Sequence, residues 1–248
     1  MAEILLKDGE RINQLFSTDV KIIQNREVFS YSVDSVLLSR FPNLPKRGLI
    51  VDLCAGNGAV GLFASTRTKA QIIAVEIQER LADMAQRSIE LNNLTSQMQV
   101  IQDDLKYLTR YISGSKVDMI LCNPPYFKVD EHSNLNASRH YLLARHEIAT
   151  NLEEICQISQ RVLKSNGRLT MVHRPERFLD IIETMTAHNL APKRIQFVYP
   201  KANRKANMLL IEAIKDGSRD GLKILPPLFI HNEDGSYTPE IHEIYYGN

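Results

Sequence analysis

A glycine-rich turn between a strand and a helix constrains the fold of this chain more than any other feature. Leu49–Leu53 is a short apolar run typical of a buried strand, and Val60–Ala64 has the character of a helix. Gly56, Gly58 and Gly61 lie at this junction in the spacing GxGxxG. Such a junction is typical of α/β proteins, in which ligands bind beyond the carboxyl ends of the strands.

Strand-like and helical runs alternate along most of the remaining chain. Further strands are expected at Gln71–Glu76, Gln99–Ile101, Val117–Cys122 and Arg168–His173, and helices at Val33–Phe41, Gln78–Asn92, Asn151–Lys164 and Glu176–His188. We expect the helix at Asn151–Lys164 to end at Asn166 and Gly167. Ile195–Tyr199 and Met208–Ala213 are separated by a short turn without a helix, which favours an antiparallel hairpin. The sequence therefore predicts a mostly parallel sheet with helices on both faces.

Acidic residues lie at the ends of three successive predicted strands, and they indicate which ligand the glycine-rich turn binds. By pattern alone, Glu76 at the end of the second strand fits the ribose of a dinucleotide, and a nicotinamide-dependent oxidoreductase is one interpretation. However, Asp52 would repel a pyrophosphate at the start of the following helix. S-adenosylmethionine has no phosphate and carries an ammonium and a sulfonium, which acids attract. Glu76 can then accept from the ribose hydroxyls, and Asp104 or Asp103 from the adenine amine, although either aspartate could instead be a cap or turn residue.

The segment Asn123-Pro124-Pro125-Tyr126, which we call the acceptor turn, directly follows the buried strand Val117–Cys122. Two prolines remove backbone donors and fix the chain, so that the Asn side-chain oxygen and a proline carbonyl are available as neighbouring acceptors. This pair suits an –NH2 group on an aromatic ring or an amide, because it accepts both N–H hydrogens and orients the nitrogen toward an incoming methyl group. Tyr126 offers a flat face on which a base can stack.

These residues together resemble the successive motifs of class I S-adenosylmethionine-dependent methyltransferases. The motifs are Asp52–Gly61, Glu76, Asp104 and Asn123–Tyr126. The Asn-Pro-Pro-Tyr form is similar to that of enzymes which methylate exocyclic or amide nitrogens, above all the small-domain type and the bacterial valine-tRNA adenine-amine methyltransferases. Gln24–Phe41 and Ala144–Glu147 also resemble this family.

The resemblance implies a Rossmann-like, seven-stranded sheet whose last strand is antiparallel. It implies S-adenosylmethionine as the cofactor, with contacts from Asp34, Asp52, Cys54, Ala55, Gly56, Asn57, Gly58, Glu76, Ile77, Asp103, Asp104, Leu105 and Asn123. The catalytic residues would be Asn123, Pro124, Pro125 and Tyr126. We expect three parts: an N-terminal extension (1–45) packing on the cofactor and substrate cleft, the methyltransferase domain (46–215), and a C-terminal segment (216–248) without an assigned role.

Charge is spread unevenly along the chain. Thirty basic and 29 acidic residues give a net charge of +1, which by itself does not indicate a nucleic-acid-binding protein. Between Thr184 and Ile211 there is no acidic residue, whereas five basic residues occur: Lys193, Arg194, Lys201, Arg204 and Lys205. This basic stretch is either a solvated hairpin or a strip that contacts phosphates. Substrate contacts are expected from Phe127, Lys128, Arg139, Lys201, Arg204 and Lys205.

Several classes of site are not expected. Cys54, Cys122 and Cys156 lie far apart, which fits a reducing, cytoplasmic setting and no zinc site. No apolar run reaches the ~18 residues of a membrane span, and no secretory signal is evident. We therefore expect no metal and no membrane contact.

The leading hypothesis is methylation of the exocyclic amine of an adenine in RNA, with tRNA as the expected substrate, by direct transfer from S-adenosylmethionine. A protein glutamine-amide methyltransferase would use the same acceptor chemistry. Its relatives usually carry a separate helical N-terminal domain, whereas only about 45 residues precede the strand before the glycine-rich turn here. A methyltransferase acting on rRNA, DNA or a small molecule is the remaining alternative within the class. A catalytically silent RNA-binding protein would leave the acceptor turn unexplained.

Overall fold

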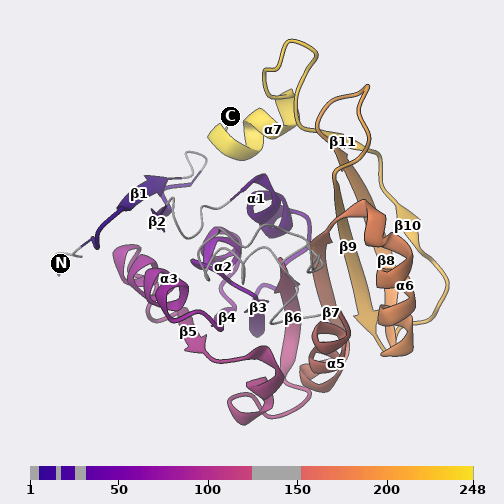
Figure 1. The fold of residues 1–248 in the computed structure, drawn as a ribbon. Coiled ribbons are helices and arrows are strands. Elements are labelled where there is room, and N and C mark those ends of the chain that lie inside the picture. Colours follow the sequence, from indigo (N-terminus) through magenta and orange to yellow (C-terminus); the bar gives the residue numbers. More distant parts are fainter. Residues whose placement is uncertain (1–5, 15–17, 26–31, 125–151, 248) are drawn as a thin grey trace, which may run out of the picture.

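The computed structural model describes residues 6–14, 18–25, 32–124 and 152–247, and these residues fold around one large mixed sheet (Figure 1). Its strands are β3 (Leu49–Leu53), β4 (Gln71–Glu76), β5 (Met98–Gln102), β6 (Val117–Cys122), β7 (Leu163–His173), β8 (Leu190–Tyr199), β9 (Met208–Lys215), β10 (Lys223–Ile224) and β11 (Leu228–Phe229). The spatial order is β10-β8-β9-β7-β6-β3-β4-β5, and β11 also pairs with β8. Strand β9 is antiparallel to its neighbours, β7 and β8. The predicted mostly parallel sheet is confirmed.

Both faces of the sheet are covered, because successive residues of its central strands enter two different apolar clusters. In β3, Ile50 packs in one cluster while Val51 and Leu53 pack in the other. In β6, Met119 and Leu121 alternate in the same way with their neighbours. Burial on both faces explains why these strands read as almost continuous apolar runs.

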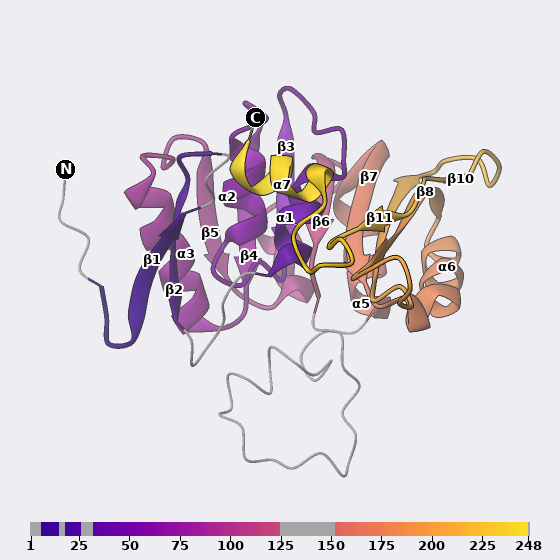
Figure 2. The same ribbon diagram turned by 90° about the horizontal axis from the view of Figure 1, so that it is seen from above.

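Helices from the two ends of the chain cover one face of the sheet, and helices from its middle cover the other (Figure 2). One face carries α1 (Val33–Arg40), α2 (Ala59–Ser65), α3 (Glu79–Leu91) and α7 (Pro239–Tyr246), and the other carries the 3₁₀ helix η1 (Leu105–Arg110), α5 (Leu152–Val162) and α6 (Phe178–Ala187), which follows the 3₁₀ helix η2 (Pro175–Arg177). Strand β7 begins directly after α5, so the helix ends two residues before the predicted end at Lys164. Asn166 has a left-handed φ of 65°, but it lies in the extended segment rather than at the helix end.

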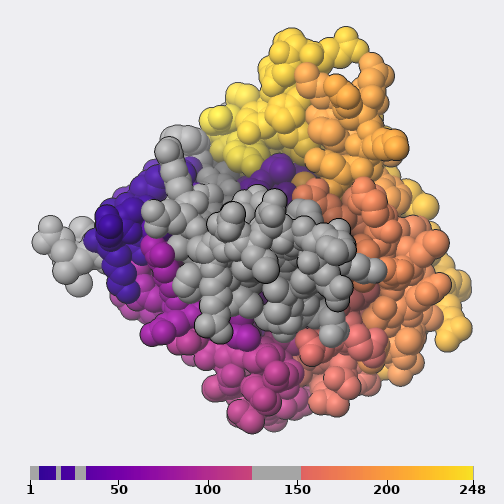
Figure 3. Space-filling view, in the orientation of Figure 1, coloured from indigo at the N-terminus to yellow at the C-terminus, as the bar shows by residue number. Residues whose placement is uncertain are grey.

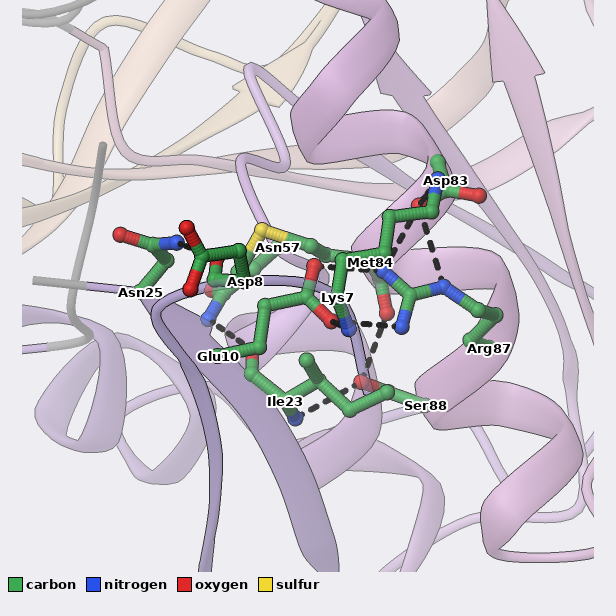
Figure 4. A network of polar contacts seen from close by, with 10 residues as sticks. All are labelled: Lys7, Asp8, Glu10, Ile23, Asn25, Asn57, Asp83, Met84, Arg87 and Ser88. Atoms are coloured by element: carbon green, nitrogen blue, oxygen red, sulfur yellow. Dashed lines mark hydrogen bonds and ion pairs between the residues drawn. The ribbon is translucent and has the colours of Figure 1, made fainter. Parts of the chain in front are cut away.

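An N-terminal hairpin of β1 (Glu10–Gln14) and β2 (Lys21–Asn25) packs against α3. Arg87 on α3 forms a 2.6 Å ion pair with Glu10 on β1, whose side chain is fully buried (Figure 4). The Ser88 hydroxyl accepts a 3.0 Å hydrogen bond from the backbone N–H of Ile23 on β2. The hairpin is therefore held to the helix that follows the second strand of the parallel sheet.

Residues after β9 enlarge the sheet beyond the predicted seven strands. The short strands β10 and β11 add to the outer edge of β8, which a seven-stranded sheet would leave open. The chain then passes through a turn closed by His231 and Tyr237 and enters α7, whose side-chain cap is Thr238. Ile241 of α7 is fully buried in the same apolar cluster as Val36 of α1. The C-terminal segment therefore covers α1.

Candidate functional site

Most of the predicted cofactor-binding and acceptor residues lie at or just beyond the carboxyl ends of four neighbouring parallel strands, β6, β3, β4 and β5. Leu53 at the end of β3 pairs with Cys122 at the end of β6, and Glu76 at the end of β4 pairs with Gln102 at the end of β5. Adjacent strands lie about 4.8 Å apart, so the segments that leave these ends are close neighbours. The sheet thus brings together the glycine-rich loop (residues 54–58), the two predicted acids and the acceptor turn.

Asp52 is completely buried beside the glycine-rich loop. Its Oδ2 accepts a 2.9 Å hydrogen bond from the backbone N–H of Gly61, whereas its Oδ1 has no hydrogen-bond partner among the described residues. Burial raises the pKa of Asp52 to about 7, the Gly61 hydrogen bond opposes this shift, and the charge of Glu76 adds to it. A nearby cation would stabilise the ionised carboxylate.

Glu76 is almost completely buried and holds the glycine-rich loop. Its Oε2 accepts a 2.7 Å hydrogen bond from the N–H of Gly56, and its Oε1 accepts a 2.9 Å bond from the N–H of Gln78. Burial raises the pKa of this carboxyl, although the backbone donors work in the other direction. Each carboxylate oxygen has a second lone pair, which can accept from a ligand hydroxyl. The next residue, Ile77, is 42% exposed and offers an apolar surface beside the acid.

The glycine-rich loop needs its glycines for conformation and for close packing. Gly56 and Gly58 have left-handed φ values of 58° and 82°, and Cys54 adopts a φ of 57° despite its side chain. A Cβ atom on Gly61 would lie 2.6 Å from Met98 Cε and 3.3 Å from Asp52 Oδ2. Ala55 and Asn57 are buried, and Asn57 Nδ2 donates a 3.0 Å hydrogen bond to the Ile23 carbonyl of the N-terminal hairpin.

Asp103 and Asp104 follow β5, and both carboxylates have partners in the structure. Asp104 caps η1, accepting 3.0 Å from the N–H of Lys106 and pairing with its ammonium at 2.7 Å. Asp103 accepts 2.8 Å from the Tyr111 hydroxyl, a hydrogen bond that lowers the pKa of this carboxyl. Leu105, the first residue of η1, is buried in the core. The sequence analysis allowed either aspartate to be a helix cap, and in the structure Asp104 is that cap.

The acceptor turn begins at Asn123, which is partly buried, and continues to the buried Pro124. Asn123 Nδ2 donates a 3.3 Å hydrogen bond to the Ser35 hydroxyl of α1. Ser35 is not among the predicted site residues, because a serine on a predicted helix face carries no motif. Its neighbour Asp34 lies on the same helix and is partly exposed. Pro125, Tyr126, Phe127, Lys128 and Arg139 lie outside the described residues.

The basic stretch divides into two groups at opposite ends of β8. Lys193 donates to the backbone carbonyls of Ser218 and Asp220, and Arg194 stacks on Phe41 and pairs with the buried Glu212. These two cations have structural partners. By contrast, the turn after Tyr199 carries Lys201, Arg204 and Lys205, which we call the basic turn; its Arg204 and Lys205 are exposed. Lys201 Nζ donates 3.1 Å to the Glu233 carbonyl.

The basic turn lies at the same edge of the sheet as the acceptor turn, because β8 is parallel to β6 through the antiparallel strand β9. Three strand spacings separate β8 from β6, or about 14 Å. Between them, Arg174 follows β7 and donates 2.8 Å to the carbonyl of Asn207, just before β9. Arg174 and the basic turn thus form a cationic border beside the acceptor turn.

His173, the last residue of β7, is a further residue at this edge that the sequence motifs do not predict. It is buried, and its Nδ1 accepts a 2.8 Å hydrogen bond from the N–H of Arg174. Burial, with Arg177 nearby, lowers the pKa of His173 to about 4, so its ring is neutral at pH 7. The sequence signal that could have identified His173 is its position as the last residue of the predicted strand Arg168–His173.

The described residues contain no group of three or more histidine, cysteine or acidic side chains placed to hold a metal ion. Within the same ranges, no helix is both long and apolar enough to cross a lipid bilayer.

The buried acids of the site suit a nucleoside with a cationic tail. Buried acids lie at the ends of β3 and β4, and Asp52 Oδ1 lacks a partner within the described chain. A diphosphate would face these two buried carboxylates, whereas an ammonium or sulfonium would neutralise them. The residues therefore fit S-adenosylmethionine better than a dinucleotide.

Comparison with known proteins agrees with this fit. The family model for the Methyltransferase small domain matches residues 19–188. The tRNA1(Val) (adenine(37)-N6)-methyltransferase of Bacteroides fragilis (strain YCH46) is 27% identical over 214 residues, covering 86% of this chain and 89% of that protein. The protein of the same name from Photobacterium profundum is 26% identical over 184 residues, covering 73% of this chain and 75% of its own length.

Solved structures share the fold. A crystal structure described as a predicted O-methyltransferase from Agrobacterium tumefaciens aligns with a TM-score of 0.68 at 24% identity, covering 86% of this chain and 96% of that one. Geranyl diphosphate C-methyltransferase from Streptomyces coelicolor A3(2) aligns with a TM-score of 0.56 at 13% identity, covering 74% and 78% of the two chains. The family model, which matches more than half of the chain, places it in the Methyltransferase small domain family, and it is an S-adenosylmethionine-dependent methyltransferase.

Proposed function

We propose that this enzyme methylates the exocyclic amine of an adenine in tRNA. The observation that carries the proposal is the position of Asn123, which follows β6 directly beside the end of β3 and its glycine-rich loop. An acceptor nitrogen held at Asn123 would therefore lie next to a cofactor held at that loop. The names of the relatives, which are adenine-N6 methyltransferases of a valine tRNA, support the substrate class.

Asn123 and Pro124 would orient the amine. The lone pair of an adenine amine is delocalised into the ring, so the nitrogen is a poor nucleophile until both N–H hydrogens are held. The Asn123 side-chain oxygen and the Pro124 carbonyl supply two neighbouring acceptors, and the hydrogen bond from Asn123 Nδ2 to Ser35 fixes the orientation of the amide. Bound S-adenosylmethionine supplies the electrophilic methyl group on its sulfonium. The amine proton can leave after transfer, so a strong general base is not required.

The cofactor contacts assigned from the sequence are part of this proposal. Asp52 would face the cationic part of the cofactor, because it is a buried acid with one oxygen that lacks a partner among the described residues. Glu76 would accept from the ribose hydroxyls with its remaining lone pairs. Asp103 or Asp104 would accept from the adenine amine, in addition to the partners described above. Asp34 would close the pocket from α1.

The cationic border would bind the RNA backbone. Arg204 and Lys205 are exposed on the basic turn, which follows β8, and three strand spacings of about 14 Å separate β8 from β6, the strand before the acceptor turn. Cations at this distance can hold phosphates of nucleotides that flank a looped-out adenine. The proposal therefore predicts a salt-sensitive interaction with RNA, since each neutralised phosphate releases counterions.

Transfer of a labelled methyl group from S-adenosylmethionine into separate tRNA, rRNA, DNA and protein fractions tests the proposal. Unmodified substrate is required, so each fraction is prepared from cells that lack this enzyme, and Asn123→Ala is the control for contaminating activities. With the wild-type enzyme, the proposal predicts label in the tRNA fraction and in no other fraction. With Asn123→Ala it predicts no label in tRNA. Label in protein would contradict the proposal and favour glutamine-amide methylation. Label in rRNA or DNA would contradict it in favour of methylation of that polymer.

A further inference from the structure

Three buried polar atoms near the glycine-rich loop have no hydrogen-bond partner among the described residues. They are Gln24 Nε2, Asn57 Oδ1 and Asp52 Oδ1. The exposed fractions of these residues are 2%, 0% and 0%, so bulk water does not hydrate them. Buried polar groups are nearly always hydrogen-bonded, and exceptions call for an explanation such as a ligand. A fourth such atom, Ser159 Oγ, lies on α5 against the other face of the sheet.

Strand β2 leads Gln24 toward the glycine-rich loop. Along β2, the N–H of Lys21 is bound by Asn92 beyond the end of α3, and the N–H of Ile23 is bound by Ser88 within α3. The carbonyl of the same Ile23 then accepts from Asn57 Nδ2 at 3.0 Å (Figure 4). Gln24 is the next residue, so it lies at the point where β2 meets the loop.

Alternation along the strand directs the Gln24 side chain. The Ile23 side chain packs with Leu81 and Met84, on the face of the hairpin that contacts α3. Side chains two residues apart share a face of a strand. Gln24 therefore shares its face with Ile22, which packs in the apolar cluster that contains Ala55 and Ala59. Both alanines belong to or border the glycine-rich loop.

The three buried atoms provide one donor, Gln24 Nε2, and two acceptors, Asn57 Oδ1 and the carboxylate oxygen Asp52 Oδ1. An amide N–H donor suits a ligand carboxylate, and the two oxygens suit an ammonium. A group that presents both charges on one carbon atom is an α-amino acid, which S-adenosylmethionine has at its methionine end. We propose that Gln24 binds the carboxylate of this methionine end, and that Asn57 Oδ1 and Asp52 Oδ1 accept from its ammonium. The inference rests on the cofactor site proposed above and adds to it a residue from outside the glycine-rich loop.

The melting temperature of the ligand-free protein distinguishes a ligand-binding role of Gln24 from a purely structural one. A buried donor without a partner is destabilising. Gln24→Met, which keeps the shape and removes the polar atoms, is therefore expected to leave the melting temperature of the free protein unchanged or raised. If Gln24 held the hairpin together, the same substitution would lower that temperature.

Two ligands separate the methionine end from the rest of the cofactor. S-adenosylhomocysteine carries the amino acid, whereas 5′-methylthioadenosine has the same nucleoside without it. Calorimetric titration of Gln24→Met is expected to show about 10- to 100-fold weaker binding of S-adenosylhomocysteine, the range for a lost hydrogen bond to a charged group. Binding of 5′-methylthioadenosine should stay within about two-fold of the wild type. Gln24→Glu, which places a carboxylate opposite the ligand carboxylate, should enlarge this difference between the two ligands.

The exposed Gln99 on β5 provides the matched control, because Gln99→Met makes the same replacement on another strand. It should leave both affinities and the melting temperature unchanged. Equal losses for both ligands in Gln24→Met, or no loss for either, would overturn the assignment of Gln24. Failure of the wild-type protein to bind S-adenosylhomocysteine would contradict the cofactor site itself.

Discussion

Glu76 accepts a 2.7 Å hydrogen bond from the backbone N–H of Gly56, so the acid that ends β4 holds the loop that follows β3. One carboxylate thereby fixes the loop and remains able to accept from a ligand. The burial of this acid is tolerated because the backbone donors of Gly56 and Gln78 compensate part of its cost.

Glu76→Gln is expected to weaken S-adenosylhomocysteine binding by at least about 10-fold, since hydrogen bonds to a charged acceptor contribute roughly 1.5–3 kcal/mol. The substituted amide cannot accept with both terminal atoms, so one of the two backbone N–H groups loses its partner. Calorimetric titration measures the effect. Glu79→Gln, three residues later and exposed, is the control and should bind normally. Equal affinities of wild type and Glu76→Gln would remove Glu76 from the cofactor site.

Ligand affinity should depend on pH through Asp52, whose pKa burial raises to about 7 in the free protein. The ammonium of the ligand favours the ionised carboxylate, so binding should weaken as pH falls and Asp52 becomes protonated. For one group with this pKa, we expect the affinity for S-adenosylhomocysteine to fall about 5-fold between pH 7 and pH 6. Titration calorimetry across this interval should show the decline in the wild type and a flat profile in Asp52→Asn. A decline of the same size in the variant would assign the proton to another group.

The same shift has a consequence for the stability of the free protein. Because the folded pKa of Asp52 lies above the unfolded value of 3.8, the folded state binds more protons than the unfolded state between these values. The contribution of Asp52 is therefore most favourable below pH 4 and is lost as pH rises through 7. Asp52→Asn should accordingly unfold at a higher denaturant concentration than the wild type at pH 8. A lower midpoint for the variant at pH 8 would contradict this sign.

Asn123→Ala should reduce turnover by at least about 100-fold, because the amine acceptor would lose one of its two orienting partners. Its affinity for S-adenosylhomocysteine should stay within a few-fold of the wild type. Ser35→Ala leaves the Asn123 amide in place and removes only its hydrogen-bond partner on α1, so a smaller loss of turnover is expected. Single-turnover methyl transfer measures both variants. Near-normal turnover in Asn123→Ala would refute the acceptor mechanism.

Charge reversal of the basic turn, with Lys201, Arg204 and Lys205 all changed to Glu, should raise the KM for tRNA and leave cofactor affinity unchanged. The slope of log affinity against log salt should also become shallower, by about 0.7 for each phosphate of a single strand that the variant no longer neutralises. A matched triple variant changes Lys46, Arg47 and Lys69, which are exposed before β3 and β4 at the opposite edge of the sheet. If both triple variants bound tRNA equally well, the basic turn would be ordinary solvated surface.

The sequence predicted the central sheet well because its strands are buried on both faces. Gln71–Glu76 and Val117–Cys122 have the predicted bounds, and the hairpin of β8 and β9 is antiparallel as expected. The two short strands β10 and β11 could not be predicted, because two residues carry no periodic pattern and form a strand only through the edge of β8. Tertiary pairing also turned the stretch after Val162 into strand, although Asn166-Gly167 reads as a helix stop.

The site was predicted unevenly for a related reason. Asp52 and Glu76 lie at the ends of predicted strands and Asn123 directly follows one, and a parallel sheet brings such positions to one edge. Ser35 and Gln24 reach this edge from α1 and the N-terminal hairpin, whose placement depends on packing between distant segments. The space-filling view shows the N-terminal hairpin at the left of the molecule and the C-terminal segment at its top (Figure 3). Local pattern carries no information about that arrangement.

The central claim is that the exocyclic amine of an adenine receives the methyl group. It is tested most directly by nucleoside mass spectrometry of tRNA from a strain lacking the enzyme, after incubation with the purified wild-type protein and S-adenosylmethionine. The account predicts N6-methyladenosine as the new nucleoside, and none with Asn123→Ala. A methyl group on a ring nitrogen or ring carbon, or on another base, would contradict the role given to the acceptor turn.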